Sequence, residues 1–335
     1  MANITRELGI DLGTTNTVIA DREKVLLHEP TAVAVMLDEW KMIEWGQAAK
    51  DMTGRVPDLI EVFFPVQYGV IAEYEITENL LKYLIQKIVG PMLLFRPKLM
   101  ITVPYGITSV ESRAVHEAGL GAGSREVYLI QAPLAAAIGI DLPISSPTGN
   151  MVISLGGGVN QAGVLALNNI ISAESERSGG KKMDQDIIDH IRKIYGVIVS
   201  PITAEIVKMR IGAAVSDVAL QEMEIQGQDQ VSGLPRTVTV TTEDIIEALQ
   251  EQLENIVILV RRTLEKTPPE LISDIMDRGV ALCGGGTQLR GIDRYLTKAL
   301  GIPAYQVDNP TTCTVLGAAR ALTMLDVLKR ALPNV

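Results

Sequence analysis

Three glycine-rich turns, each directly after an apolar strand-like run, limit most strongly what this chain can fold into. They stand in "GIDLGTTNT" (9–17), "VISLGGGVNQ" (152–161) and "GVALCGGGTQLRG" (279–291). Glycine has no Cβ, so the backbone can approach an anion closely and several N–H groups can converge on phosphate oxygens. One such turn is more often only a tight turn, but three in one chain favour phosphate-binding loops.

The composition suits a large cytoplasmic protein. Its 335 residues, 47% of them hydrophobic, fit two domains or one large body with two lobes. No stretch approaches eighteen consecutive apolar residues, and "MANITRELGI" lacks the pattern of a secretion signal, so we expect a cytoplasmic location. The net charge of −10 repels phosphate backbones, so nucleic acid is not an expected partner.

The cysteines and histidines exclude several enzyme classes. Cys283 and Cys313 stand in apolar surroundings with no partner at metal spacing, which indicates reduced core thiols. His28, His116 and His190 are scattered without ligand spacing. We therefore set aside redox chemistry, a zinc enzyme and a Ser/His/Asp hydrolase.

Strand-like and helix-like runs alternate along the chain, which is typical of an α/β fold. Thr108 and Glu111 form a predicted capping box, Thr203 begins a later helix, and Pro268 ends a long amphipathic one. The Pro/Ser/Gly-rich stretch 142–150 is the predicted domain boundary. We expect strands over 98–104 and 126–130, and helices over 76–89, 109–119, 132–139 and 243–265.

The two halves of the chain begin alike. Residues 9–20 and 152–167 each read as an apolar strand, a glycine-rich turn and a second strand. This similarity suggests an internal duplication of one strand–loop–strand unit.

The order and content of these loops resemble the superfamily of actin, sugar kinases and heat-shock-chaperone ATPases. Within it, the chain resembles the bacterial actins of the MreB family nearly from end to end. Extended blocks carry this resemblance, among them "GIDLGTTNT" (9–17), "VPYGITSVESRAVHEAGLGAGSREVYLI" (103–130), "TAEIVKMRIG" (203–212) and "LEKTPPELISDIMDRGVALCGGGTQLRGID" (264–293).

The resemblance implies an actin-like ATPase fold of the α/β class. Two lobes of duplicated ribonuclease-H-like domains would enclose a nucleotide cleft. Domain I would comprise 1–145 and 311–335, with a subdomain IB at about 32–65, and domain II would comprise 146–310, with a subdomain IIB at about 179–240.

The resemblance also implies which residues bind ATP and Mg²⁺. Asp11 would hold the hydrated Mg²⁺, and Gln131 would help to position the attacking water. Glu205 and Lys208, one helical turn apart on one face, match the E-x-x-K that contacts ribose and base, although an ordinary surface ion pair is the alternative. The first phosphate loop would comprise Asp11, Gly13, Thr14, Thr15 and Asn16, the second Gly156, Gly157 and Gly158, and the turn on the adenine side Gly284, Gly285, Gly286 and Thr287.

The second loop departs from the family pattern in its side chains. MreB proteins usually read Asp-x-Gly-Gly-Gly-Thr-Thr-Glu, whereas Ser154, Val159, Asn160 and Gln161 replace the acid, both threonines and the glutamate here. Because the glycines remain, we expect phosphate binding to persist while the organisation of metal-bound water suffers. Gln131 stands where a glutamate is usual, and glutamine orients water but accepts no proton. We expect ATP binding with at most slow hydrolysis.

Lys181 replaces an acid that usually follows the paired glycines. Three roles stay open for it: a contact to phosphate, a contact between the lobes, or a solvated side chain. The sequence does not choose among them.

The resemblance implies a cytoskeletal protein that polymerises into paired protofilaments on the inner face of the cytoplasmic membrane and governs cell shape. Its partners would be further copies of itself, the membrane, and possible paralogues or wall-synthesis proteins. The long helix 243–265 is a candidate pairing surface through the part that its apolar row leaves exposed. A small-molecule phosphotransferase of the same superfamily and a non-polymerising regulator of another MreB are the alternatives.

An apolar run between two prolines is the candidate membrane contact. "GPMLLFRP" (90–97) places Met92, Leu93, Leu94 and Phe95 in an expected loop. A loop folded back onto the core is the alternative. We favour insertion into the membrane, because MreB relatives insert an apolar loop at this place, with weak single contacts multiplied along a filament.

Overall fold

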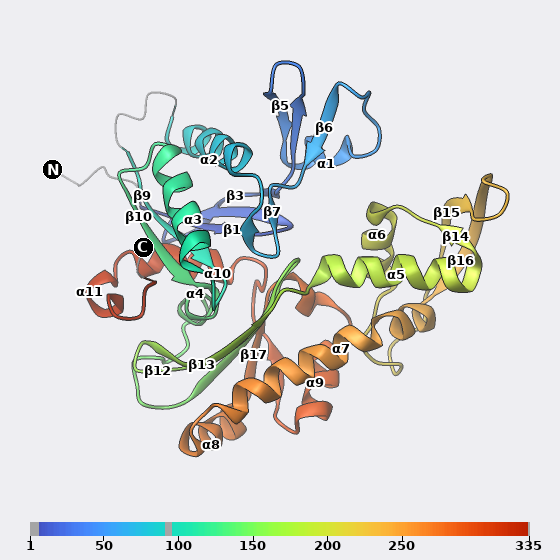
Figure 1. Cartoon of the computed structure of the whole chain (residues 1–335). Helices are drawn as coiled ribbons and strands as arrows, with labels where there is room; N and C mark the ends of the chain where they lie inside the picture. Colours follow the sequence, from blue (N-terminus) through green and yellow to red (C-terminus); the bar gives the residue numbers. More distant parts are fainter. Residues whose placement is uncertain (1–6, 91–95, 334–335) are drawn as a thin grey trace.

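Two five-stranded sheets with the same strand order form the frame of the protein (Figure 1). The computed structural model describes residues 7–90 and 96–333. In each sheet the first three strands pair antiparallel, the fourth pairs in parallel with the first, and the fifth pairs in parallel with the fourth. The first sheet has the order β3 (Val25–Pro30), β2 (Asn16–Ala20), β1 (Glu7–Leu12), β9 (Lys98–Val103), β10 (Glu126–Gln131), and the second β13 (Asn169–Glu176), β12 (Asn160–Ala166), β11 (Asn150–Leu155), β17 (Val280–Cys283), β18 (Ala304–Gln306). This repeat confirms the predicted duplication.

Two helices, α4 (Ala132–Gly139) and α10 (Cys313–Ala321), lie between the sheets. One buried cluster contains their apolar side chains together with Met100 and Ile130 of the first sheet and Val152 and Leu165 of the second. The helices cross so closely that a Cβ at Gly317 would lie 1.8 Å from the carbonyl oxygen of Ala135. This contact holds the two sheets at a fixed separation.

Helices also cover the outer faces of both sheets. The first is covered by α2 (Tyr74–Val89) and α3 (Ser109–Gly121), and the second by α5 (Gly180–Tyr195), α7 (Thr242–Glu265) and α9 (Ile292–Leu300). Further helices are α6 (Pro201–Ile211), α8 (Pro269–Arg278) and α11 (Leu325–Leu328).

Each half carries a smaller sheet away from the centre (Figure 1). One contains β4 (Val33–Met36), β5 (Lys41–Trp45) and β6 (Ile60–Phe63) beside α1 (Gly46–Asp51), and the other contains β14 (Val197–Ile198), β15 (Glu222–Asp229) and β16 (Pro235–Thr241). A two-stranded ribbon of β7 (Val66–Gln67) and β8 (Val70–Ile71) follows the first. These parts face each other across the gap between the halves.

The predicted elements are present with small shifts at their ends. The capping box is confirmed, because Thr108 Oγ1 accepts from Glu111 N and the Glu111 carboxylate accepts from Thr108 N. The predicted start at Thr203 is wrong: α6 begins at Pro201, because the Ser200 side chain caps it by accepting from Thr203 N. Proline fits the first helical turn, which needs no intrahelical N–H bond there. For the same reason α8 begins at Pro269, shortly after the long helix ends at Glu265.

Replacing Gly317 by alanine is expected to destabilise the ligand-free protein by at least about 2 kcal/mol, because the added methyl group forces α4 and α10 apart. Urea unfolding measures the difference. Gly285→Ala is the matched control, because the nearest atom to an added Cβ there is 4.0 Å away. Equal stabilities of the two variants would show that the helix crossing is not tight.

Candidate nucleotide-binding site

A glycine hairpin follows the first strand of each large sheet, one between β1 and β2 and the other between β11 and β12. Both hairpins close with the same hydrogen bond. Gly13 N donates to Asn16 O at 3.0 Å, and Gly156 N donates to Val159 O at 3.0 Å. The duplicated sheets therefore present two loops of the same backbone shape.

The two hairpins touch each other. A Cβ at Gly157 would lie 1.9 Å from Thr15 Oγ1, and one at Gly158 would lie 2.4 Å from Thr14 Oγ1. The Thr14 hydroxyl also accepts from Gly69 N, in the turn between β7 and β8, at 2.8 Å. At both positions glycine lets the main chain of the second hairpin lie against the threonine side chains of the first. Two glycine hairpins in contact are an arrangement suited to a polyphosphate.

The third predicted turn packs against the end of β11, just before the second hairpin. Gly284 has φ +87°, and a Cβ there would lie 2.4 Å from Leu155 O. Its N–H donates to Pro310 O at 2.8 Å, and Thr287 Oγ1 donates to Gly284 O at 2.8 Å. Gly285 and the residues after it form a short 3₁₀ helix, Gly285–Gln288. All three glycine-rich turns are thus brought together.

Two main-chain hydrogen bonds join the second hairpin to the first turn of α5. Gly180 N donates to Gly156 O at 2.9 Å, and Lys181 N donates to Gly157 O at 2.8 Å. Two of the amides that an α-helix leaves without intrahelical partners are thereby satisfied by the loop. The hairpin and the helix form one unit.

Asp11 and Ser154 occupy the same place in the two halves, the last but one residue of β1 and of β11. The Asp11 carboxylate accepts from Thr102 Oγ1 at 2.5 Å. Asp11 as a residue is only half-buried, but its carboxylate is enclosed by protein. Desolvation of the carboxylate raises the pKa of Asp11, whereas the hydrogen bond from Thr102 and the charge of His28 lower it by less. Ser154 offers a hydroxyl where symmetry would allow a second carboxylate, and lies in register beside Cys283.

Glu205 and Lys208, both on α6, each bind a partner on another helix. Lys50 Nζ of α1 lies 2.5 Å from Glu205 Oε2. Lys208 Nζ lies 2.6 Å from the Asp184 carboxylate and donates to Gly180 O at 2.7 Å. Burial raises the pKa of Asp184, and Lys208 opposes that shift. In the described part of the chain, the surface pair between Glu205 and Lys208 is therefore not formed.

Two of the departures from the family pattern join the halves. Lys181 Nζ lies 4.6 Å from the ring centre of Phe64, so this lysine makes a contact between the lobes. Tyr105 N, after β9, donates to Gln161 Oε1 at 2.7 Å.

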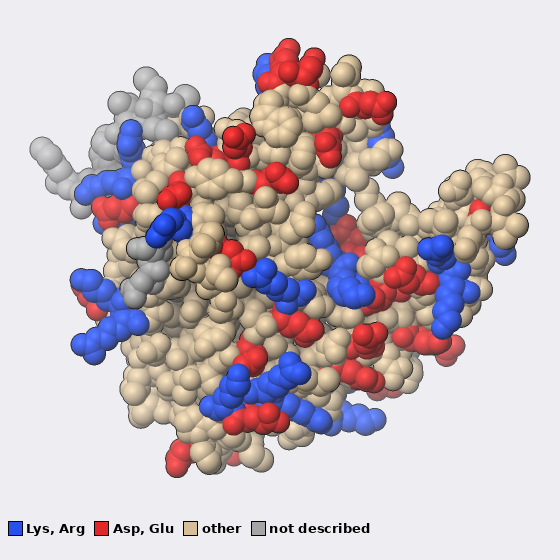
Figure 2. Space-filling model, in the orientation of Figure 1, with Lys and Arg blue, Asp and Glu red and all other residues tan. Residues whose placement is uncertain are grey.

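Gln131 is the last residue of β10 and stands at the N-terminus of α4. Figure 2 shows basic and acidic side chains together where the α1 region faces α5 and α6.

Sequence reasoning missed several of these contacts. Thr102 is 91 residues from Asp11, and Lys50 is 155 residues from Glu205. Neither pair has a local spacing signal, because only the fold brings the partners together. Phe64 was missed for the same reason.

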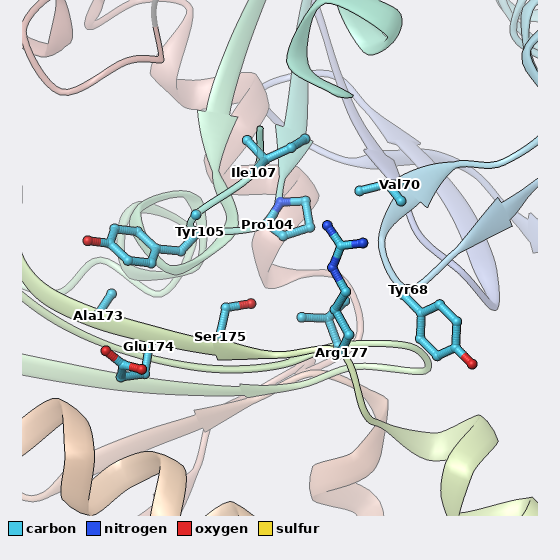
Figure 3. Close-up of a pocket in the computed structure, with 11 residues that line it drawn as sticks. Tyr68, Val70, Pro104, Tyr105, Ile107, Ala173, Glu174, Ser175 and Arg177 are labelled. Atoms are coloured by element: carbon cyan, nitrogen blue, oxygen red, sulfur yellow. The ribbon is translucent and has the colours of Figure 1, made fainter. Parts of the chain in front are cut away.

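A pocket of about 250 Å³ lies beside the second hairpin, between β13 and the segment after β9 (Figure 3). Val159 lines it, and Arg177 points into it. Arg177 donates to Glu111 Oε1 at 2.7 Å. Burial opposes the charged form of Glu111, but hydrogen bonds from Thr108 and Arg177 outweigh it and hold its pKa below the ordinary value. The other lining residues are Tyr68, Val70, Pro104, Tyr105, Gly106, Ile107, Ala173, Glu174 and Ser175.

The predicted membrane loop, Met92 to Phe95, lies outside the described residues. Within residues 7–90 and 96–333, no helix combines the length and the apolar character that crossing a bilayer requires. The long helix α7 buries its apolar row, including Ile245, Leu253 and Val260, while Ile258 remains 44% exposed.

Two matching sheets, two facing glycine hairpins and a helix pair between the sheets define an actin-like nucleotide-binding fold. A family model described as "MreB/Mbl protein" matches residues 5–330. The chain belongs to the MreB/Mbl family.

Named relatives agree with this assignment. The chain is 41% identical to the cell shape-determining protein Mbl of Bacillus cereus, covering 98% of this chain and 99% of the relative. It is also 41% identical to the cell shape-determining protein MreB of Escherichia coli, covering 96% and 95%. The crystal structure of MreB5 of Spiroplasma citri bound to ADP superposes with a TM-score of 0.91 at 30% identity, covering 98% of each chain. The MamK double helical filament, at 19% identity and a TM-score of 0.80, shares the fold over 94% of this chain and 98% of MamK.

Asp11→Asn is expected to stabilise the ligand-free protein at pH 7. Because the pKa of Asp11 is raised in the folded protein, the folded protein holds its proton more tightly than the unfolded chain does. The carboxyl group of Asp11 therefore lowers the free energy of unfolding, and it does so increasingly as pH rises above the ordinary pKa near 3.8. Asparagine removes that contribution and still accepts from Thr102. Urea unfolding at pH 7 and pH 4 should show an advantage that disappears at the lower pH.

Asp58→Asn provides the control, because it makes the same chemical change at an exposed position. A gain for Asp11→Asn of equal size at both pH values would contradict the burial of a charged carboxylate.

Proposed function

We propose that this protein binds ATP with Mg²⁺ between its two lobes and assembles into filaments that determine cell shape, with hydrolysis slowed. Membership of the MreB/Mbl family and relatives named as cell shape-determining proteins support this. The MreB5 structures of Spiroplasma citri bound to ADP and to AMPPNP support nucleotide binding by the same fold. In our proposal domain I comprises 1–145 and 311–335, and domain II comprises 146–310.

The observation that carries the proposal is the meeting of the two glycine hairpins. Glycine at these contact positions leaves the N–H groups of the second hairpin unshielded by side chains of its own, so they could contribute to a cradle for the phosphates. Thr14 and Thr15 line it from the first lobe. Glu205 and Lys208 would contact ribose and base, and the turn at 284–287 would border the adenine.

The carboxylate of Asp11 near this cradle fits a weakly held Mg²⁺, because Mg²⁺ is often held by one or two carboxylates with several waters. The ion would neutralise phosphate charge when bound. Asp11 supplies one carboxylate, and among residues 7–90 and 96–333 no group of three or more His, Cys, Asp or Glu could hold a metal. Because Ser154 stands at the position equivalent to Asp11, only the carboxylate of Asp11 would order the water bound to Mg²⁺. Gln131 would orient the attacking water without accepting its proton. Binding without efficient turnover follows.

Ser154→Asp is expected to raise phosphate release from Mg-ATP at least about tenfold, because it restores a carboxylate at the position equivalent to Asp11. Phosphate release is measured at a protein concentration where both proteins sediment. Ser154→Asn, of similar size and uncharged, is the control and should remain slow.

Native protein that hydrolyses as fast as Ser154→Asp would contradict the slow-turnover part of the proposal. Asp11 and Gln131 would then form a sufficient hydrolytic site. ATP-dependent sedimentation of the native protein separately tests assembly, and its absence would leave the regulator of another MreB as the better explanation.

We further propose that the filaments lie on the inner face of the cytoplasmic membrane. The apolar run Met92, Leu93, Leu94 and Phe95 supports this proposal. Each loop would bind weakly, and assembly would multiply the contacts. Paralogues and wall-synthesis proteins are the further partners that such a filament would recruit.

The double change Leu93→Ser and Phe95→Ser is expected to reduce, several-fold, sedimentation with vesicles of phosphatidylethanolamine and phosphatidylglycerol, because it removes apolar surface from the loop. Sedimentation without vesicles should not change. Val110→Ser is the control, because Val110 is 77% exposed on α3. Undiminished vesicle binding by the double variant would refute insertion of this loop.

A further inference from the structure

An ion pair joins the two halves across the gap that they enclose. Lys50 lies near the end of α1, beside the β4–β5–β6 sheet, and Glu205 lies on α6 in the other half. Lys50 Nζ approaches Glu205 Oε2 to 2.5 Å, and the two side chains are only 22% and 23% exposed. A charge pair shielded to this degree is screened less by solvent than an exposed surface pair.

Glu205 is held by this contact in a defined way. Lys50 occupies one carboxylate oxygen, Oε2, and a carboxylate has lone pairs on both oxygens. Lys208, one turn further along α6, is engaged by Asp184 and by Gly180 O. Glu205 is thus paired with Lys50, whereas Lys208 is paired with α5.

A second contact crosses the gap close by. Lys181, on the first turn of α5, places its ammonium 4.6 Å from the centre of the Phe64 ring, just after β6. Both contacts link the outer part of the first half to helices α5 and α6 of the second. The gap is therefore closed on the side where Glu205 stands.

We propose that Lys50 is a positioning residue: it holds Glu205 so that the second carboxylate oxygen accepts from a ribose hydroxyl, and it thereby couples nucleotide binding to closure of the lobes. This inference rests on the proposed function, because Glu205 must contact ribose. A side chain already fixed by one partner loses less conformational freedom when it gains another. Coupling of this kind is reciprocal: closure favours nucleotide, and nucleotide favours closure.

The test is a thermodynamic cycle between Lys50→Met and the ribose hydroxyls. Dissociation constants are measured for ATP, 2′-deoxy-ATP and 3′-deoxy-ATP with native and variant protein. Native protein should bind ATP about fivefold more tightly than the analogue lacking the contacted hydroxyl, and Lys50→Met should lose most of that preference. Lys41→Met is the control, because Lys41 is exposed on β5 and has no ion pair in the described part of the chain.

Two outcomes would overturn the proposal. A ribose preference unchanged in Lys50→Met would show that Lys50 does not act through Glu205, even if ATP binding weakens overall. Tighter ATP binding by the variant would show that Lys50 competes with ribose for the carboxylate. Loss of folding is excluded by comparing thermal unfolding with that of the Lys41→Met control.

A measurement without nucleotide separates this inference from the proposed function. Spin labels at Asp58 and Arg210, both exposed and on opposite halves, report the distance between the lobes. Lys50→Met should lengthen and broaden that distance in ligand-free protein, and an unchanged distribution would refute the closing role. Native protein that binds no ATP would instead refute the proposed function and, with it, the ribose contact.

Discussion

The close crossing of α4 and α10 is the constraint on which the rest of the structure depends. These two helices are the layer shared by both sheets, and the carbonyl of Ala135 occupies the space that a side chain at position 317 would need. A wider crossing would move the sheets apart and separate the hairpins at their edges. The contact of Thr14 and Thr15 with the second hairpin therefore depends on the packing of small residues where α4 and α10 cross.

Local pattern was enough to predict the α/β class, the duplicated loops and most of the long helices, because glycine turns and apolar spacing act over a few residues. The same pattern could have paired Asp11 with Ser154, since both stand two residues before a hairpin glycine. It could not assign Thr102 to Asp11 or Lys50 to Glu205, because those contacts join distant segments. The start of α6 was missed because the Ser200 cap was overlooked.

In our proposal, nucleotide binding and ATP hydrolysis depend on different chemical groups of the site. Phosphate binding would depend on the main chain, and the glycines that would permit it are present. Hydrolysis would depend on side-chain carboxylates, and one of the two symmetric positions holds a serine. Gln161, which stands in place of a glutamate, accepts a hydrogen bond from Tyr105 N in the segment after β9. Substitution at side chains can therefore change the fate of the nucleotide without altering the cradle.

The two hydrogen bonds between the second hairpin and α5 also have a mechanical consequence. Both carbonyls of the hairpin that accept from α5 belong to the loop that we propose to bind the phosphates. The helix has 16 residues, or about 24 Å, and β14 of the outer small sheet begins just beyond its end. If the hairpin and α5 tilted as one unit, a helix of this length would move the small sheet through a larger displacement than the hairpin itself.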